Sequence, residues 1–308
     1  MTDSKNELRK HPIIILGVDR SGTSLVANLV HLWGAYGGDL AQLSKGDEGN
    51  RHGYWENQLL ADFMEHFGID IGIDFWHPSY VDVITTKAAD PYYRNKALSL
   101  ISMMERKERV WFWKEPWLSV MLPFWKQIWS GATYVITVRN PYDSALSWQK
   151  FFLPEEAQLK ISIVAATLLR WQAMLMSALE NTQDCTRKIF IRYEDLVNEP
   201  QKQCRRLFNF LSDEYRLKRI DDGQLESILG TVDSKSWRNR SSTPFNDVSI
   251  ATESQKALYQ FLLEKIDDPD KPFDATQYPI YPGWREYMGN LEILRDLYIQ
   301  LKKISDRG

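Results

Sequence analysis

The feature that most constrains the fold is a short apolar run, a glycine-rich loop and a helical pattern that follow one another near the start of the chain. Residues 12–18 (PIIILGV) are apolar and β-branched without alternation, which is typical of a strand buried on both faces of a parallel sheet. Residues 17–24 (GVDRSGTS) have the glycine spacing of a phosphate-binding loop. Apolar residues then recur at helical spacing over 23–33, so the sequence predicts a strand, a tight loop and a helix in that order.

Three later runs repeat the strand pattern, at residues 109–114 (RVWFWK), 133–139 (TYVITVR) and 188–193 (KIFIRY). Each is followed by a helical pattern, and this alternation indicates parallel βα units of an α/β fold. We expect one domain over 1–308, with a core at about 12–211 and a basic loop with further helices over 212–308. The expected helices are 55–67, 159–182, 198–211, 253–266 and 284–304, and the expected loops are 34–50 and 232–248.

Composition excludes several classes of protein. The chain has 38 basic and 41 acidic residues, a net charge of -3, so a general nucleic-acid surface is not expected. The polar start has no apolar signal region, and no stretch has the roughly 18 apolar residues of a membrane span, so we expect a cytoplasmic protein. Cys185 and Cys204 are too few for a disulfide framework or a cysteine-based metal site.

The phosphate-binding loop lacks the lysine of a nucleotide triphosphatase. Thr23 stands where that lysine would follow Gly22, and the loop cation is Arg20. An arginine inside the loop suits a donor that carries one transferable group on its 5′-phosphate and needs no bridging magnesium, such as 3′-phosphoadenosine 5′-phosphosulfate (PAPS). The alternatives are a P-loop kinase or triphosphatase, a binding module with a decayed nucleotide fold, and a glycine turn that only joins strand to helix.

A second motif lies at the end of the third strand-like run. Arg139 ends the run, Pro141 suits the first turn of a helix, and Ser147 follows eight residues after the arginine. The planar fork of Arg139 and the hydroxyl of Ser147 could hold one phosphate group together. Taken alone, an Arg-Asn-Pro helix start is common, and its joint occurrence with the glycine loop makes it informative.

Through GVDRSGTS, VRNPYDSALSW and YEDLVNEP at residues 193–200, the chain resembles the PAPS-dependent sulfotransferase family, in the form found in bacterial members. The resemblance covers about residues 12–211. It implies a three-layer P-loop-type fold with a central parallel sheet of about five strands. It also implies that the first loop holds the 5′-phosphosulfate, that Arg139 and Ser147 hold the 3′-phosphate, and that Tyr193 lies near the adenine. The loop residues concerned are Asp19, Arg20, Ser21, Gly22, Thr23 and Ser24.

The resemblance further implies a late basic loop at the 3′-phosphate, for which residues 234–242 (SKSWRNRSS) supply Lys235, Arg238 and Arg240. This stretch departs from the glycine-containing form of the cytosolic small-molecule enzymes. Arg20 replaces their loop lysine, as in bacterial and tyrosylprotein members. Leu25 replaces the tryptophan that stacks on adenine, so the adenine contacts stay open.

The reaction that the resemblance implies is sulfuryl transfer to a hydroxyl or amine, which needs charge stabilisation and a base for the acceptor proton. Arg20 and Lys114, at the end of the second strand-like run, are the candidates for the charge. The candidate bases are Glu56 and His52 in RHGYWEN, and Glu115 in WKEPW. Several branches of the family that the chain resembles use a glutamate after the first helix and loop, whereas the cytosolic small-molecule enzymes use a histidine just after the lysine-bearing strand. No histidine follows Lys114 here, so the resemblance favours Glu56, although a carboxylate there could also only stabilise a helix start.

The sequence leaves the acceptor open among small molecules and carbohydrates, and a role in secondary metabolism is the expectation. No histidine spacing indicates a metal, and the oligomeric state is not predicted. Some aromatic residues close to the proposed site in sequence are candidates for the acceptor pocket. They are Trp55, Phe75, Trp76, Trp113 and Trp117.

Overall fold

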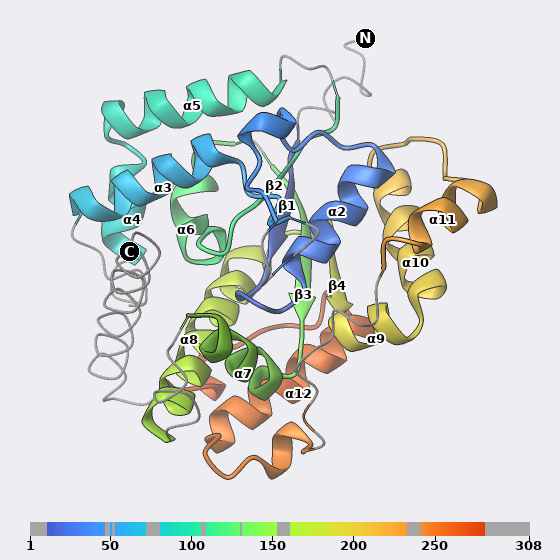
Figure 1. Ribbon diagram of the computed structural model, residues 1–308. Coiled ribbons are helices and arrows are strands. Elements are labelled where there is room, and N and C mark those ends of the chain that lie inside the picture. Colours follow the sequence, from blue (N-terminus) through green and yellow to red (C-terminus); the bar gives the residue numbers. More distant parts are fainter. Residues whose placement is uncertain are drawn as a thin grey trace, which may run out of the picture.

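The computed structural model of the chain has a central parallel sheet with helices packed on both faces (Figure 1). It describes residues 11–46, 50, 53–71, 81–105, 109–129, 131–152, 161–232, 241 and 243–280. The sheet contains β1 (Ile13–Leu16), β2 (Phe112–Lys114), β3 (Thr133–Val138) and β4 (Lys188–Arg192). All four predicted strands are therefore confirmed, each one to three residues shorter than its apolar run.

The strands lie in the order β2-β1-β3-β4, and every neighbouring pair is parallel. β1 lies inside the sheet, with Ile14 opposite Trp113 on one side and Tyr134 on the other. The described residues form four strands where the resemblance implied about five. On the outer side of β2, the described residues form one isolated parallel bridge, between Tyr36 and Trp111. Gly37 and Gly38 follow Tyr36, and glycine weakens a strand, so the pairing does not continue.

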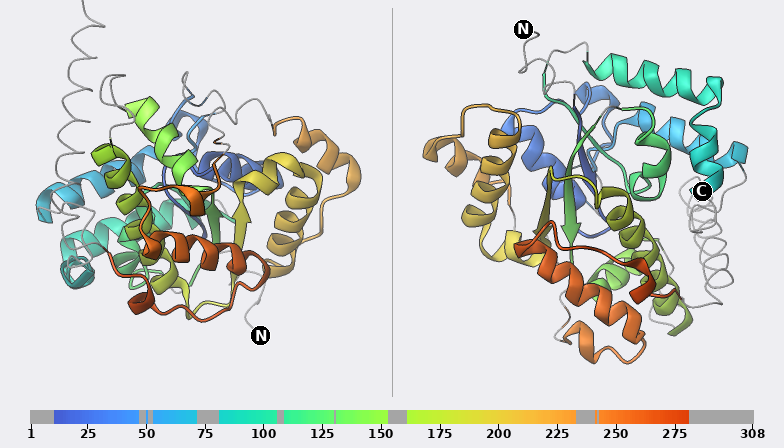
Figure 2. Two further views of the ribbon diagram at one scale, coloured as in Figure 1. Left: turned by 90° about the horizontal axis from the view of Figure 1, so that it is seen from below. Right: turned by 180° about the vertical axis from the view of Figure 1, so that it is seen from behind.

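Successive residues of β1 point into two separate cores, as expected for a strand covered on both faces. Ile14 and Leu16 belong to the larger core, which α6 and α8 line, whereas Ile13 and Ile15 belong to a second core beneath α2 and α10. Figure 2 shows the helices on the two sides of the sheet. The predicted three-layer α/β architecture is confirmed.

The helices of the first half are α2 (Thr23–Trp33), α3 (Gln58–Ile71), α4 (Val81–Lys87), α5 (Pro91–Glu105), α6 (Leu118–Trp125) and α7 (Pro141–Phe152). Those of the second half are α8 (Ile161–Thr182), α9 (Tyr193–Asn198), α10 (Pro200–Glu214), α11 (Asp222–Leu229) and α12 (Glu253–Asp267). Single 3-10 turns occupy Leu40–Gln42, Phe245–Asp247 and Ala275–Gln277. The predicted helices at 159–182, 198–211 and 253–266 are confirmed within three residues at each end. The helix predicted at 284–304 lies outside the described residues.

Sequence analysis missed α4 and α5. Tyr93, Ala97, Ile101 and Met104 of α5 are buried at the spacing of one helix face. The signal was therefore present in the sequence, although polar residues between these positions weaken it.

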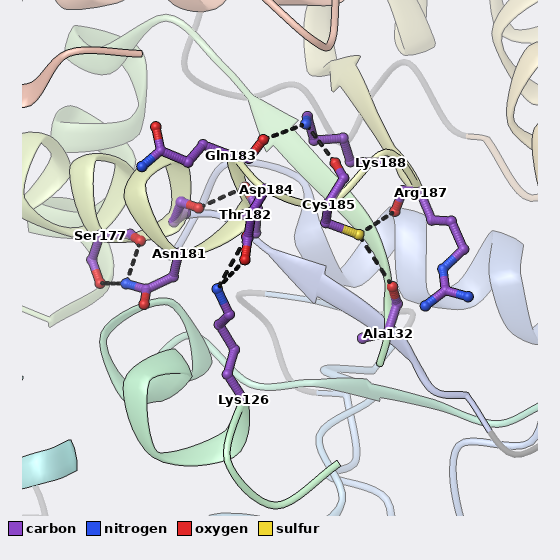
Figure 3. Close-up of polar contacts among 11 residues, drawn as sticks. Lys126, Ala132, Ser177, Asn181, Thr182, Gln183, Asp184, Cys185, Arg187 and Lys188 are labelled. Carbon is purple, nitrogen blue, oxygen red and sulfur yellow. Dashed lines mark hydrogen bonds and ion pairs between the residues drawn. The ribbon is translucent and has the colours of Figure 1, made fainter. Parts of the chain in front are cut away.

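A compact set of polar contacts turns the chain from α8 into β4 at the amino-terminal edge of the sheet (Figure 3). Lys188 Nζ donates to the Cys185 carbonyl oxygen at 2.5 Å, and Cys185 Sγ lies 3.6 Å from the Ala132 carbonyl oxygen. Lys126 Nζ binds the Asp184 carboxylate at 3.1 Å. Two of these contacts satisfy backbone carbonyls at a tight turn and the third is a side-chain ion pair, so structural roles account for the polar residues there.

The opposite, carboxyl-terminal edge of the sheet brings together the loops that carry the motifs. One residue of the motifs directly follows each strand: Gly17 after β1, Glu115 after β2, Arg139 after β3 and Tyr193 after β4. Ligands in open parallel sheets bind at this edge. Within the part of the chain that the structure describes, no helix is long and apolar enough to cross a bilayer.

Candidate functional site

The loop between β1 and α2 owes its shape to two glycines. Gly17 and Gly22 have φ values of 145° and 95°, which other residues rarely adopt. A Cβ atom at Gly17 would lie 2.1 Å from Thr137 Oγ1, and one at Gly22 would lie 2.4 Å from the Tyr193 ring. Both positions therefore require glycine for conformation and for space.

Ser21 holds this loop from inside. Its hydroxyl donates to the Val18 carbonyl oxygen at 2.6 Å and lies 2.8 Å from Thr137 Oγ1. The backbone N–H of Ser21 also donates to Val18. The hydroxyl and the backbone N–H of Ser21 thus form hydrogen bonds within the protein, and these bonds stabilise the shape of the loop.

Helix α2 begins at Thr23, with Gly22 at its N-cap, and no described side chain caps this turn. Its first N–H groups and the positive end of the helix dipole therefore face the loop. Of the predicted loop set, Asp19 and Arg20 precede this helix start, and Thr23 and Ser24 belong to its first turn. The arrangement can bind an anion.

Arg20 joins the loop to the second motif. Its Nε donates to Ser147 Oγ at 3.1 Å, and Arg139 Nη1 donates to the Arg20 carbonyl oxygen at 2.6 Å. Arg20 has a φ of 64°, a left-handed conformation that costs a non-glycine residue about 1–3 kcal/mol. The structure thus brings together the three residues that the sequence singled out from two separate motifs.

Arg139 is almost fully buried, and this burial lowers the pKa of its guanidinium. The guanidinium carbon lies 4.6 Å from the centre of the Tyr193 ring, a cation–π contact. Because the same ring packs against Gly22, Tyr193 joins the phosphate loop to Arg139. Burial raises the pKa of the Tyr193 hydroxyl, so this group is a hydrogen-bonding phenol at neutral pH.

Pro141 begins α7, as predicted, and Asn140 caps it. Asn140 Oδ1 accepts the N–H of Tyr142 at 2.9 Å, and the Asn140 N–H donates to Glu194 Oε1 at 2.8 Å. Glu194 therefore fixes the turn that presents Arg139. Sequence analysis missed this role, although Glu194 lies in the quoted YEDL motif.

Lys114 and Glu56 form an ion pair, with 2.5 Å between Lys114 Nζ and Glu56 Oε1. Lys114 ends β2 and its side chain is only 3% exposed, whereas that of Glu56 is 22% exposed. Asn57 Oδ1 accepts the N–H of Leu59 at 3.1 Å, so Asn57, and not Glu56, caps α3. Glu56 is therefore not the side-chain cap of this helix, and its carboxylate faces the end of β2.

Glu115 lies beside this pair and is buried. Burial raises the pKa of its carboxyl group, and the charge of Glu56 raises it further, against the smaller effect of Lys114. The Trp117 N–H donates to Glu115 Oε2 at 2.6 Å. The Glu115 carboxyl group therefore stabilises the turn after β2, and it is less accessible to an acceptor than the carboxylate of Glu56.

Other predicted site residues divide into two groups. Trp113 is buried in the larger core, while Trp55 and Trp117 are partly buried near the site. His52, Phe75, Trp76, Lys235, Arg238 and Arg240 lie outside the described residues. Ser241, next in the chain, donates its N–H to Asp143 Oδ1 at 2.8 Å.

Arg170 is a site residue that sequence analysis missed altogether. It forms a buried ion pair with Asp19 of the phosphate loop. A signal existed, because Arg170 is the single charge in the apolar stretch IVAATLLRWQAML. Its partner could not be inferred, since the two residues are far apart in the sequence.

A model of the sulfotransferase family matches residues 12–216, a stretch that contains the site residues from Gly17 to Glu194. The chain belongs to the sulfotransferase family. The sulfotransferase domain of the Synechococcus PCC 7002 olefin synthase is 16% identical, with 82% of this chain and 95% of that chain covered and a TM-score of 0.51. A sulfotransferase from Mycobacterium avium is 14% identical, with 83% and 77% covered and a TM-score of 0.50.

These two structures show that the fold of this sulfotransferase is that of bacterial relatives. A search of curated proteins found no match to the sequence. Among the described residues of the sulfotransferase, no group of three or more His, Cys, Asp or Glu side chains is arranged to hold a metal ion.

Proposed function

We propose that this sulfotransferase uses PAPS as donor and transfers its sulfuryl group to a hydroxyl or amine of a small-molecule or carbohydrate acceptor, leaving adenosine 3′,5′-bisphosphate. The observation that carries the proposal is the convergence of Arg20, Arg139 and Ser147 beside the start of α2. Arg139 and Ser147 suit a phosphate at the 3′ position of the ribose, which ATP does not carry, and Arg20 lies between them and the loop.

The residues present fit this donor. Gly22 and the uncapped N–H groups of α2 suit the 5′-phosphosulfate, and Arg139 with Ser147 suits the 3′-phosphate. Tyr193 is the candidate for the adenine side because it packs against both Gly22 and Arg139. Thr23 replaces the lysine on which the kinase alternative depends.

PAPS supplies a sulfuryl group attached to a phosphate that can leave. A bond forms between the acceptor oxygen or nitrogen and sulfur, and the bond between sulfur and the bridging oxygen breaks, with its electron pair passing to the phosphate. Arg20 and Lys114 stabilise the charge that develops on that oxygen. Glu56 takes the proton of the acceptor.

The ion pair supports a joint role of Glu56 and Lys114 in the proposed reaction. Their contact of 2.5 Å sets the proton acceptor next to the cation, so proton removal and charge stabilisation occur side by side. His52 and Glu115 are the remaining candidates for the base. Glu56 is preferred over Glu115 because its side chain is the more exposed of the two and, within the described part of the chain, accepts no backbone N–H.

The proposal is tested by incubating the protein with sulfur-labelled PAPS and acceptor extracts, with Arg139→Ala as the matched control. Label should move into an organic product with the wild-type protein, in the presence of EDTA, and fall sharply with the variant. Transfer of phosphate from ATP-Mg, with no transfer of sulfur, would favour the kinase alternative instead.

A further inference from the structure

A carboxylate in the phosphate loop needs an explanation. Asp19 lies between Val18 and Arg20, and its side chain is 14% exposed. A negative charge at this position repels an anionic ligand, and the repulsion is strong where water is largely excluded. With Asp19 and Arg20 together, the loop side chains carry no net charge.

Arg170 supplies the missing positive charge from α8. Its guanidinium pairs with the Asp19 carboxylate, and the side chain is only 7% exposed. The guanidinium carbon lies 5.7 Å from the ring centre of Trp117 and 5.4 Å from that of Trp148. Arg170 is thus in cation–π contact with two aromatic rings, which restrict its position.

These contacts connect Arg170 to three site segments. Asp19 belongs to the loop after β1, Trp117 to the turn after Lys114, and Trp148 directly follows Ser147. The charge of Asp19 also reaches the end of β2. It contributes to the raised pKa of Glu115, after the larger effects of burial and Glu56.

We infer that Arg170 is a positioning residue that neutralises Asp19 and so allows the loop to accept an anionic nucleotide. The inference rests on the proposed function, since it concerns the loop assigned to the 5′-phosphosulfate. Loss of Arg170 leaves a buried carboxylate uncompensated beside the anion, whereas loss of both charges removes the conflict.

A double-mutant cycle separates this role from simple bracing. The variants are Arg170→Met, which removes the charge and keeps an unbranched apolar side chain, Asp19→Asn, and the two combined. The affinity for adenosine 3′,5′-bisphosphate is measured by calorimetry at low and high salt, with uncharged adenosine as control ligand. Thermal unfolding of each variant is recorded alongside.

Arg170→Met should weaken bisphosphate binding tenfold or more, and Asp19→Asn in the same chain should restore it to within about threefold. Asp19→Asn alone should bind as tightly as the wild type or tighter at low salt. The affinity for adenosine should stay the same throughout. If Arg170→Met does not fold, the affinity of Asp19→Asn for the bisphosphate tests the inference without it.

The inference is overturned if Arg170→Met binds the bisphosphate with wild-type affinity, or if the double variant binds it as weakly as Arg170→Met. It is also overturned if Asp19→Asn alone weakens the binding of the bisphosphate. Each result would make the ion pair a brace between the loop and α8. Failure of the wild-type protein to bind the bisphosphate has a different meaning, because it would contradict the proposed function itself.

Discussion

Lys114 Nζ lies 2.5 Å from Glu56 Oε1, so the last residue of β2 is joined to the residue that precedes the cap of α3. The contact connects two chain segments that the sequence offers only as separate candidates. It places a cation and a carboxylate at the carboxyl-terminal edge of the sheet, next to the phosphate loop.

Glu56→Gln should lower turnover about a hundred- to ten-thousandfold, the range expected for loss of a general base. The amide retains the size of the carboxylate but does not take up the proton. Binding of adenosine 3′,5′-bisphosphate should be unchanged, as measured by calorimetry. Glu65→Gln, an exposed change on α3, is the control. Near-normal turnover of the Glu56 variant, with chemistry limiting, would move the test to His52 and Glu115.

Arg20→Ala should reduce turnover more than it reduces affinity for the desulfated product, because the proposed interaction of Arg20 strengthens as the bridging oxygen gains charge. Ser147→Ala is the companion variant, since it removes the hydroxyl that Arg20 Nε contacts and leaves the guanidinium. Steady-state kinetics and product titration give the two quantities. Equal losses in both would assign Arg20 to ground-state binding only.

Gly22→Ala should destabilise the fold more than Gly34→Ala. Both glycines have positive φ values, so both variants incur backbone strain of about 1–3 kcal/mol. Only at Gly22 does the new Cβ meet the Tyr193 ring, at 2.4 Å, whereas nothing lies within 4 Å at Gly34. Urea unfolding measures the difference. Equal losses of stability would mean that the Tyr193 ring moves aside without cost.

Glu115→Gln should change how stability depends on pH. Burial raises the folded-state pKa of Glu115. In the wild type, the contribution of Glu115 to the free energy of unfolding is therefore complete at any pH below the unfolded-state pKa of this group. That contribution is lost as pH rises through the folded-state pKa. The variant has no such loss, and its unfolding free energy relative to the wild type should therefore increase with pH. Parallel stability curves between pH 4 and pH 8 would contradict this account.

The sequence predicts what local patterns encode. The β1 strand, its loop and α2 follow from the run PIIILGVDRSGTS and the periodicity after it, and Pro141 marks the start of α7. Glu56 is a candidate base from its position after the first helix and loop and from the absence of a histidine after Lys114. That its carboxylate meets Lys114 depends on how the segment before α3 is held, with the Glu56 carbonyl accepting the Ser44 N–H at 2.9 Å.

Contacts between distant segments account for what the sequence did not predict. The Asp19–Arg170 pair joins the first loop to α8, and Glu194 fixes the turn before α7 through the Asn140 N–H. The left-handed backbone of Arg20 likewise exists because Arg139 and Ser147 hold it from other elements. None of these relations has a local periodicity or spacing from which it could be inferred.

The site is proposed to recognise a nucleotide with phosphates at both the 5′ and 3′ positions. Calorimetric titration of the wild-type protein and Arg139→Ala with adenosine 3′,5′-bisphosphate and with adenosine 5′-monophosphate tests it most directly. The account predicts a strong preference of the wild type for the bisphosphate. It also predicts a loss of about ten- to a hundredfold in that affinity for the variant, which corresponds to one charge-assisted contact. Equal affinity of the wild type for the two nucleotides would contradict it.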